Sequence, residues 1–129
     1  MATVTLPDYP TGIEFEEFIS AYVQCSGRFV DRNLHERFPD DICELDIAAT
    51  EHREDGYATL IVEVKSGNWR LHELFTLRGK MQYLGVTDGA IVSLQVPDKS
   101  ETRKHVAEKI NIQMACVDTH EQAEEALRP

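Results

Sequence analysis

Two apolar segments joined by a short polar turn constrain the fold of this chain most strongly. They are ICELDIAA at Ile42–Ala49 and YATLIVEVK at Tyr57–Lys65. The intervening residues 50–56, TEHREDG, end in Asp-Gly, which is a strong signal for a β-hairpin turn. We therefore expect two neighbouring antiparallel strands, the second of which ends at Ser66, Gly67 and Asn68.

Helices and further strands are predicted on both sides of this hairpin. Thr11 and Glu14 form a capping box, so we expect a helix over 12–26 to begin there. The other expected elements are strands at Arg28–His35, Ala90–Val96 and Ile112–Val117, and helices at about Arg70–Leu84, 100–110 and Thr119–Leu127. The resulting order, α-β-β-β-α-β-α-β-α, predicts an α/β (α+β) fold in which helices flank a mixed sheet.

The length, charge and cysteine content limit the function classes that we expect. With 129 residues the chain suits one domain, and no apolar stretch approaches the roughly 18 residues of a membrane span. The net charge of −10 argues against a broad, nonspecific phosphate-binding surface, but it allows a local basic patch or a metal that bridges to phosphate. Cys25, Cys43 and Cys116 lie far apart, which predicts buried reduced thiols, not a zinc site or disulfides. Without a signal-peptide pattern, the expected location is the cytoplasm.

Charged side chains occupy the end of the third strand, where a buried strand should be apolar. Because strand side chains alternate between faces, Glu63 and Lys65 point the same way. On the preceding strand Asp46 faces the side opposite to Leu45 and Ile47, and hairpin pairing can set Asp46 beside Glu63. Carboxylates this close repel each other unless a divalent cation neutralises them. The pattern predicts Mg²⁺ or Mn²⁺ on Asp46 and Glu63, with Lys65 orienting or deprotonating a water or stabilising charge on phosphorus.

Several other polar residues are candidates for the same site, each with a simpler alternative. Glu16 lies at the edge of the apolar stripe of the first helix, so it either reaches toward the carboxylates or is a solvated flank. Arg78 and Gln82 are i,i+4 partners that point either onto the site and its substrate or into solvent. Ser66 either contacts substrate or is only a turn residue. Glu44 is either part of the cluster or a solvated strand residue.

The combination of these motifs resembles the PD-(D/E)xK nuclease superfamily, which includes many restriction endonucleases and the archaeal-type Holliday junction resolvases. The matching segments are Gly12-x-x-Phe15-Glu16, Glu44-Leu45-Asp46-Ile47-Ala48 and Glu63-Val64-Lys65. The resemblance covers about residues 11–96 and implies a restriction-endonuclease-like core of order α-β-β-β-α-β, with a C-terminal extension at 97–129. One departure is Leu45, which stands where the superfamily's name places proline.

The resemblance also implies a role for each matching residue. Asp46 is the metal-binding aspartate, Glu63 the second acidic ligand and Lys65 the catalytic lysine. Glu16 matches an acidic residue that many members keep in the first helix, where it would hold a second metal or a water. The polar residue often found in the following helix is matched by Gln82 or, less directly, by Lys80 or Arg78.

These residues predict a divalent-metal-dependent endonuclease that hydrolyses phosphodiester bonds, with DNA expected in preference to RNA. Cutting both strands of a duplex usually needs two sites, which favours a homodimer. One alternative is a noncatalytic module of the same fold that binds nucleic acid or a partner protein in a larger defence or repair assembly. Another is a metal-dependent hydrolase of a different phosphorylated substrate.

Overall fold

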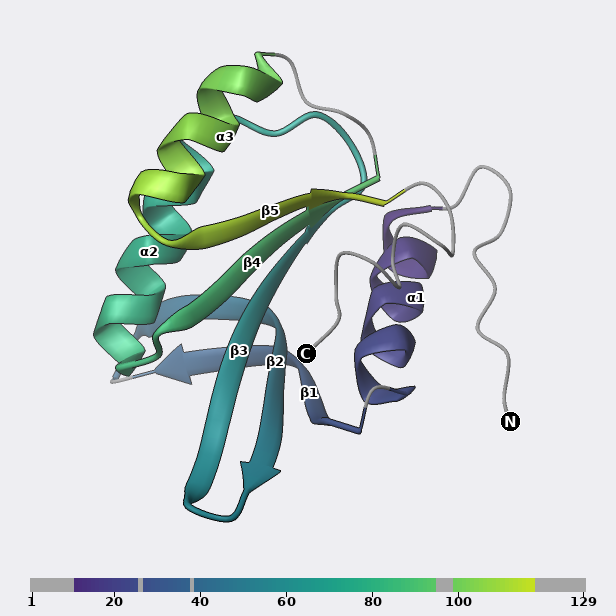
Figure 1. Cartoon of the computed structure of the whole chain (residues 1–129), viewed down its shortest axis with the longest axis vertical. Coiled ribbons are helices and arrows are strands. Elements are labelled where there is room, and N and C mark those ends of the chain that lie inside the picture. Colours follow the sequence, from purple (N-terminus) through teal and green to yellow (C-terminus); the bar gives the residue numbers. More distant parts are fainter. Residues whose placement is uncertain (1–10, 26, 38, 95–98, 118–129) are drawn as a thin grey trace.

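The chain folds as an α/β arrangement with a five-stranded mixed sheet and helices on both of its faces (Figure 1). The computed structural model describes residues 11–25, 27–37, 39–94 and 99–117. Their elements are α1 (Gly12–Cys25), β1 (Phe29–Arg37), β2 (Asp41–Arg53), β3 (Gly56–Lys65), α2 (His72–Leu84), β4 (Asp88–Ser93), α3 (Ser100–Lys109) and β5 (Ile112–Cys116). This order confirms the predicted fold class, while the helix expected at Thr119–Leu127 lies outside the described residues. None of the described helices is long and apolar enough to cross a membrane.

The sheet has the strand order β1-β2-β3-β4-β5. Strands β1, β2 and β3 are antiparallel neighbours, whereas β4 and β5 each run parallel to the preceding strand. Parallel neighbours need crossover connections, which α2 and α3 supply. The C-terminal ends of β3, β4 and β5 therefore meet at one edge of the sheet, where open α/β sheets commonly place their ligands.

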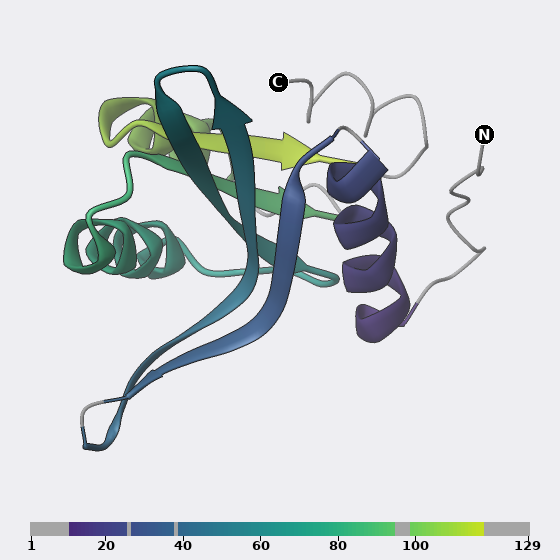
Figure 2. The same cartoon turned by 90° about the horizontal axis from the view of Figure 1, so that it is seen from below.

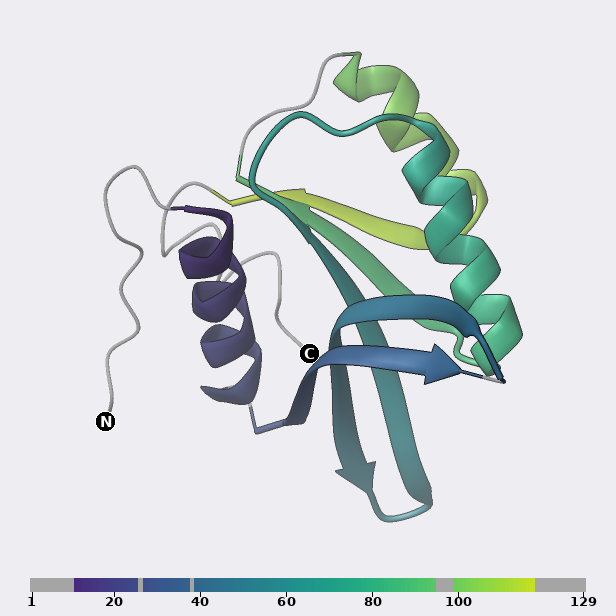
Figure 3. The ribbon, with the colours of Figure 1, turned by 180° about the vertical axis from the view of Figure 1, so that it is seen from behind.

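The two faces of the sheet carry different helices (Figures 2 and 3). Buried apolar side chains form a separate core on each face. The α1 face buries Phe15, Phe18, Ile19, Val23, Ile47, Ala49, Val62, Ala90, Val92 and Val117. The face covered by α2 and α3 buries Leu45, Ile61, Trp69, Leu74, Leu77, Met81, Ile91, Ala107 and Ile112. Strand β3 contributes Ile61 to one core and Val62 to the other, as strand alternation predicts.

Local sequence signals set the ends of two helices as expected. The Thr11 N–H donates to Glu14 Oε1 at 3.1 Å, and the Glu14 N–H donates to Thr11 Oγ1 at 3.2 Å, so the capping box is formed. Helix α2 ends at Gly85, which has a φ of 70° and donates its N–H to Gln82 O.

The β2–β3 hairpin is longer than predicted, because β2 continues to Arg53 and pairs there with Gly56. Only residues 54 and 55 form the turn, whereas the sequence suggested that residues 50–56 were all loop. Ladder hydrogen bonds join backbone groups and do not require apolar side chains, so the polar residues 51–53 remain in the strand.

The far end of the β1–β2 hairpin extends away from the rest of the sheet (Figure 2). This bend corrects one prediction, that Leu45 and Ile47 share a face. Leu45 is buried with the α2 core, whereas Ile47 is buried with the α1 core. Simple alternation therefore fails for β2 at the residues that flank Asp46, where the strand leaves the plane of β3.

The cysteines form no disulfide, but the expectation that they are buried is wrong. Cys25 is exposed, and Cys43 and Cys116 are half-buried. Their positions explain this: Cys25 is the last residue of α1, Cys43 lies on the extended β1–β2 hairpin, and Cys116 ends the edge strand β5.

Candidate active site

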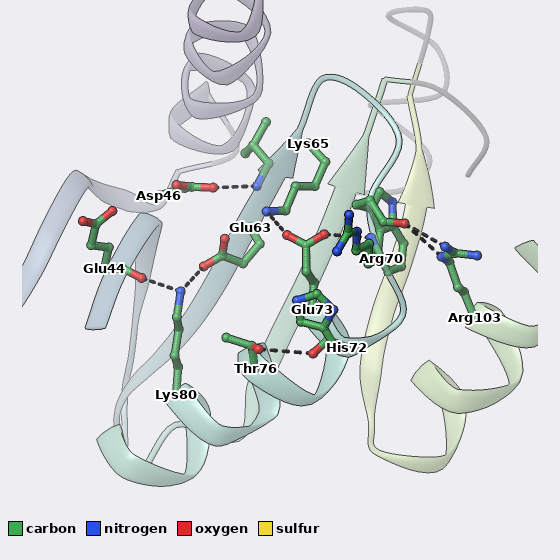
Figure 4. Close-up of polar contacts among 12 residues, drawn as sticks. Glu44, Asp46, Glu63, Lys65, Arg70, His72, Glu73, Thr76, Lys80 and Arg103 are labelled. Carbon is green, nitrogen blue, oxygen red and sulfur yellow. Dashed lines mark hydrogen bonds and ion pairs between the residues drawn. The ribbon is translucent and has the colours of Figure 1, made fainter. Parts of the chain in front are cut away.

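Asp46 and Glu63 lie side by side where β2 leaves β3 (Figure 4). The paired residues of the two strands end at Ile47 and Val62, so the next residue outward on each strand is one of these carboxylates. Asp46 Oδ2 accepts a hydrogen bond of 2.9 Å from the Val64 N–H, in a region beyond the regular ladder. The structure therefore brings together the two acidic residues that the sequence paired.

Glu63 is a carboxylate in a poorly solvated position, with only 8% of the residue exposed. Burial raises its pKa above the ordinary value, and the negative charge of Asp46 raises this pKa further. The hydrogen bond and charge of Lys80 and the charge of Lys65 lower the pKa, but they do not cancel the rise. The ionised form of Glu63 is thus disfavoured by the protein, and a nearby positive charge would relieve this cost.

Lys80 of α2 is the cation that contacts Glu63 directly. Its Nζ donates to Glu63 Oε1 at 3.0 Å and to the backbone oxygen of Glu44 at 2.7 Å (Figure 4). The two side chains are largely enclosed, with 18% of the Lys80 side chain and 11% of the Glu63 side chain exposed. Lys80 therefore links α2 to both strands of the hairpin across the candidate site.

Lys65 projects from the same face of β3 but has a different partner. Its Nζ lies 2.5 Å from Glu73 Oε1, and the other oxygen of Glu73 accepts the Arg70 N–H at 2.9 Å. Partial burial lowers the pKa of Lys65, but the ion pair with Glu73 and the charges of Glu63 and Asp46 outweigh it, so the net shift is upward. For Glu73, burial raises the pKa, yet the bonds from Lys65 and Arg70 leave it below the ordinary value.

A small cavity of about 60 Å³ lies among these charged groups. It is lined by Glu63, Lys65, Glu73, Thr76, Leu77, Lys80 and Ile91. A volume of this size has room for a few water molecules. A larger cavity of about 240 Å³ lies elsewhere, against residues at the start of β4 and β5, and no predicted site residue lines it. Cavity size alone would therefore have pointed away from the carboxylate pair.

The donor set at the site consists of two carboxylates, and Glu16 is not its third member. Among the described residues, no group of three or more histidine, cysteine, aspartate or glutamate side chains is arranged to hold a metal ion. Glu16 instead pairs with Arg32 at 3.4 Å, on the α1 side of the sheet. A cation held here would have Asp46 and Glu63 as its carboxylate ligands and would complete its shell with water and substrate oxygens, as Mg²⁺ commonly does.

In the described part of the chain, the predicted substrate-binding residues make no hydrogen bond or ion pair with Asp46 or Glu63. Gln82 is exposed and Arg78 is half-buried on α2. Ser66 is exposed just after β3, and a Cβ built on Gly12 would lie 3.1 Å from its Oγ. Gly12 thus lets the start of α1 approach Ser66 closely. Their roles toward substrate stay predictions.

Sequence reasoning missed Glu73 and ranked Lys80 below Gln82. Glu73 and Lys80 lie on α2 seven positions apart, which places them on the same side of the helix, with Leu77 between them. That spacing could have indicated a charged pair facing the strands. An acidic residue in the first turn of a helix is also expected for capping alone, and Glu73 does accept a hydrogen bond from the Arg70 N–H. Its position in the sequence therefore did not by itself indicate a role in the site.

Comparison with known proteins gives the fold but no family. No family model and no curated protein sequence matches the chain. Protein VC1899 from Vibrio cholerae has a similar structure, with a TM-score of 0.69 and 16% identity over 90% of this chain and 32% of that one. AF1548, a protein of unknown function, matches with a TM-score of 0.60 and 16% identity over 78% of this chain and 55% of its own. The chain thus spans about a third of the first protein and just over half of the second.

Proposed function

We propose that this protein is a divalent-metal-dependent nuclease of the PD-(D/E)xK type, which hydrolyses phosphodiester bonds in nucleic acid, and in DNA in preference to RNA. The observation that carries the proposal is the adjacent pair Asp46 and Glu63 at the end of β3, with Lys65 on the same face of that strand. Two neighbouring carboxylates, one of them buried, are unfavourable alone, and a hard divalent cation relieves their repulsion. The α-β-β-β-α-β order of the first six elements adds support through its resemblance to that superfamily.

Asp46 and Glu63 would hold Mg²⁺ or Mn²⁺ through their carboxylate oxygens. The donors fit because they are hard oxygens and carry negative charge, and Glu63 lines a cavity with room for a few waters. When bound, such a cation polarises a phosphoryl oxygen and lowers the pKa of a bound water. A second metal near Glu16 would first require the ion pair between Glu16 and Arg32 to open.

Lys65 acts as a cation in this mechanism. Its pKa is raised by the ion pair with Glu73 and by the charges of Glu63 and Asp46, which supports a role as a positively charged hydrogen-bond donor. An ammonium group beside the reacting phosphate stabilises the negative charge that develops on its oxygens. Of the roles that the sequence allowed, we therefore favour charge stabilisation or orientation of a water over its deprotonation.

The test is a cleavage screen with single-stranded, double-stranded and branched DNA and with RNA, in Mg²⁺, Mn²⁺ or EDTA. We expect metal-dependent cleavage by the full chain, and its loss in Asp46→Ala and in Lys65→Ala. The matched control is Lys104→Ala, which alters an exposed lysine on α3. Circular dichroism checks that each variant is folded. Full activity in both site variants would refute the proposal.

A homodimer is part of the proposal where the substrate is double-stranded or branched. Each domain has one candidate site, and breaks in both strands of a duplex usually need two. Sedimentation of the protein alone and with a branched duplex would measure the stoichiometry, and a 1:1 complex that still cuts both strands would contradict this part.

The second candidate function is a noncatalytic module that binds nucleic acid or a partner protein in a larger defence or repair assembly. Two observations favour it: the net charge of −10, and a chain that spans only 32% and 55% of the two similar structures. The lack of cleavage of any nucleic acid in the screen, together with no Mn²⁺ binding by calorimetry, would favour this function over the nuclease.

A further inference from the structure

Lys80 is bound by the same kinds of oxygen that a divalent cation would use. Its Nζ contacts a carboxylate oxygen of Glu63 at 3.0 Å and the backbone oxygen of Glu44 at 2.7 Å. Carboxylate and backbone carbonyl oxygens are typical ligands of hard divalent cations. An ammonium group that makes these contacts neutralises part of the charge that such a cation would otherwise neutralise.

The other lysine of the site is not available for this task, because Lys65 is paired with Glu73. Glu73 is itself held in place by the Arg70 N–H at 2.9 Å. Lys80 is therefore the direct ion-pair partner of Glu63 (Figure 4). Its charge also lowers the pKa of Glu63, which means that it stabilises the ionised carboxylate.

The Lys80 side chain can leave this position without movement of its helix. The neighbouring residues Leu77 and Met81 anchor α2 in the apolar core and are fully buried. A lysine has a flexible four-carbon stem, so its ammonium group can rotate toward solvent while the backbone stays fixed. With an exposed fraction of 18%, the Lys80 side chain is already in contact with solvent.

We infer that Lys80 is a resident counter-ion of Glu63 and that its ammonium group is displaced when a divalent cation binds. The inference rests on the proposed metal site at Asp46 and Glu63. Lys80 thereby regulates the site: its ammonium group occupies Glu63 Oε1 and the Glu44 backbone oxygen without metal and lowers the affinity for metal. Removal of its charge strengthens metal binding, because the cation no longer competes with a positive group only a few ångströms from Glu63.

The test compares Mn²⁺ binding by calorimetry in the wild type, Lys80→Met and the control Lys104→Met, at one pH and ionic strength. We expect Lys80→Met to bind Mn²⁺ about tenfold more tightly than the wild type, as the loss of a nearby like charge predicts. Lys104→Met should bind as the wild type does. Equal or weaker binding by a folded Lys80→Met protein overturns the inference but leaves the metal site intact. If neither the wild type nor Lys80→Met binds Mn²⁺, the metal site is overturned as well.

A second measurement does not depend on the stability of the variant. In the wild-type protein, the NMR signals of the Lys80 side-chain CεH₂ group should shift and sharpen as Mg²⁺ saturates the site, because the ammonium group loses its two oxygen partners. The signals of Lys104 serve as the control. Unchanged Lys80 signals in the presence of bound Mg²⁺ overturn the displacement.

Discussion

Replacement of Glu63 by glutamine should stabilise the metal-free protein at neutral pH. The ionised Glu63 is disfavoured first by burial and then by the charge of Asp46, and its pKa is raised accordingly. Glutamine has nearly the same shape, carries no charge and keeps an oxygen that can accept the hydrogen bond from Lys80. The substitution therefore removes the cost of the buried charge while preserving the packing.

The expected gain is about 1 kcal/mol at pH 7, the usual size for a stabilising change at a functional site. It is limited because Lys80 and Lys65 already offset part of the cost. In a domain of 129 residues a gain of this size raises the midpoint of thermal unfolding by roughly 3–5 °C.

The gain should depend on pH in a defined direction. Because the folded-state pKa of Glu63 is raised, the stability that its neutral form contributes is fully present below the ordinary value of 4.5 and is lost as the pH rises through the folded-state pKa. Glutamine cannot lose a proton. The difference in stability between Glu63→Gln and the wild type should thus be smallest below pH 4.5 and should grow as the pH rises to neutrality.

Urea unfolding of both proteins in EDTA across this pH range measures the difference directly. Added Mn²⁺ should reverse the ranking of the two proteins. The ion binds the folded wild type and stabilises it, whereas Glu63→Gln lacks one of the two carboxylates that would hold the ion. A Glu63→Gln protein that is less stable than the wild type at pH 7 in EDTA would show that the buried carboxylate is not a strained group, and the reasoning would fail.

Two other substitutions test the surroundings of the site. Glu73→Gln should lower the free energy of unfolding by at most about 1 kcal/mol, because the ion pair with Lys65 is partly exposed. The same substitution should lower the pKa of Lys65, which would move the alkaline limit of the cleavage rate to lower pH. Since the pKa of Glu73 lies below its ordinary value, its stabilising contribution is present above pH 4.5 and is lost as the pH falls through the folded-state pKa. Acidification should therefore lower the stability of the wild type more than that of Glu73→Gln, as measured by urea unfolding. Arg103→Met removes hydrogen bonds of 3.2 and 2.8 Å to the backbone oxygen of Trp69 and should cost about 1–3 kcal/mol in urea unfolding. An unchanged midpoint, equal to that of Lys104→Met, would contradict this role.

Much of the fold could be predicted because its signals are local. The capping box at Thr11 and Glu14 and the alternation of β3 each depend on a few adjacent residues, and both are confirmed. Alternation on β3 also placed Glu63 and Lys65 on one face. The hairpin supplied the register that sets Asp46 next to Glu63.

The remainder of the site depends on how a helix lies across the sheet, which periodicity alone does not fix. The stripe of α2 includes several polar residues, and only its packing decides that Lys80 meets Glu63 while Gln82 faces solvent. Glu16 lies at the edge of its helix, as expected, but the neighbouring strand offers it Arg32 as a partner. The bend of β2 could not be predicted either, since alternation assumes a straight strand.

The local charge of the site bears on how so acidic a protein could bind nucleic acid. The carboxylates Asp46, Glu63 and Glu73 and the ammonium groups Lys65 and Lys80 together leave one formal negative charge, against −10 for the whole chain. A divalent cation would change the local charge to one positive, which a single phosphodiester group would neutralise. Metal and phosphate binding should therefore reinforce each other at this edge of the sheet, while the acidic remainder of the surface repels other phosphates. On this reasoning the net charge limits nonspecific binding to duplex DNA without excluding a metal-dependent contact with one phosphate.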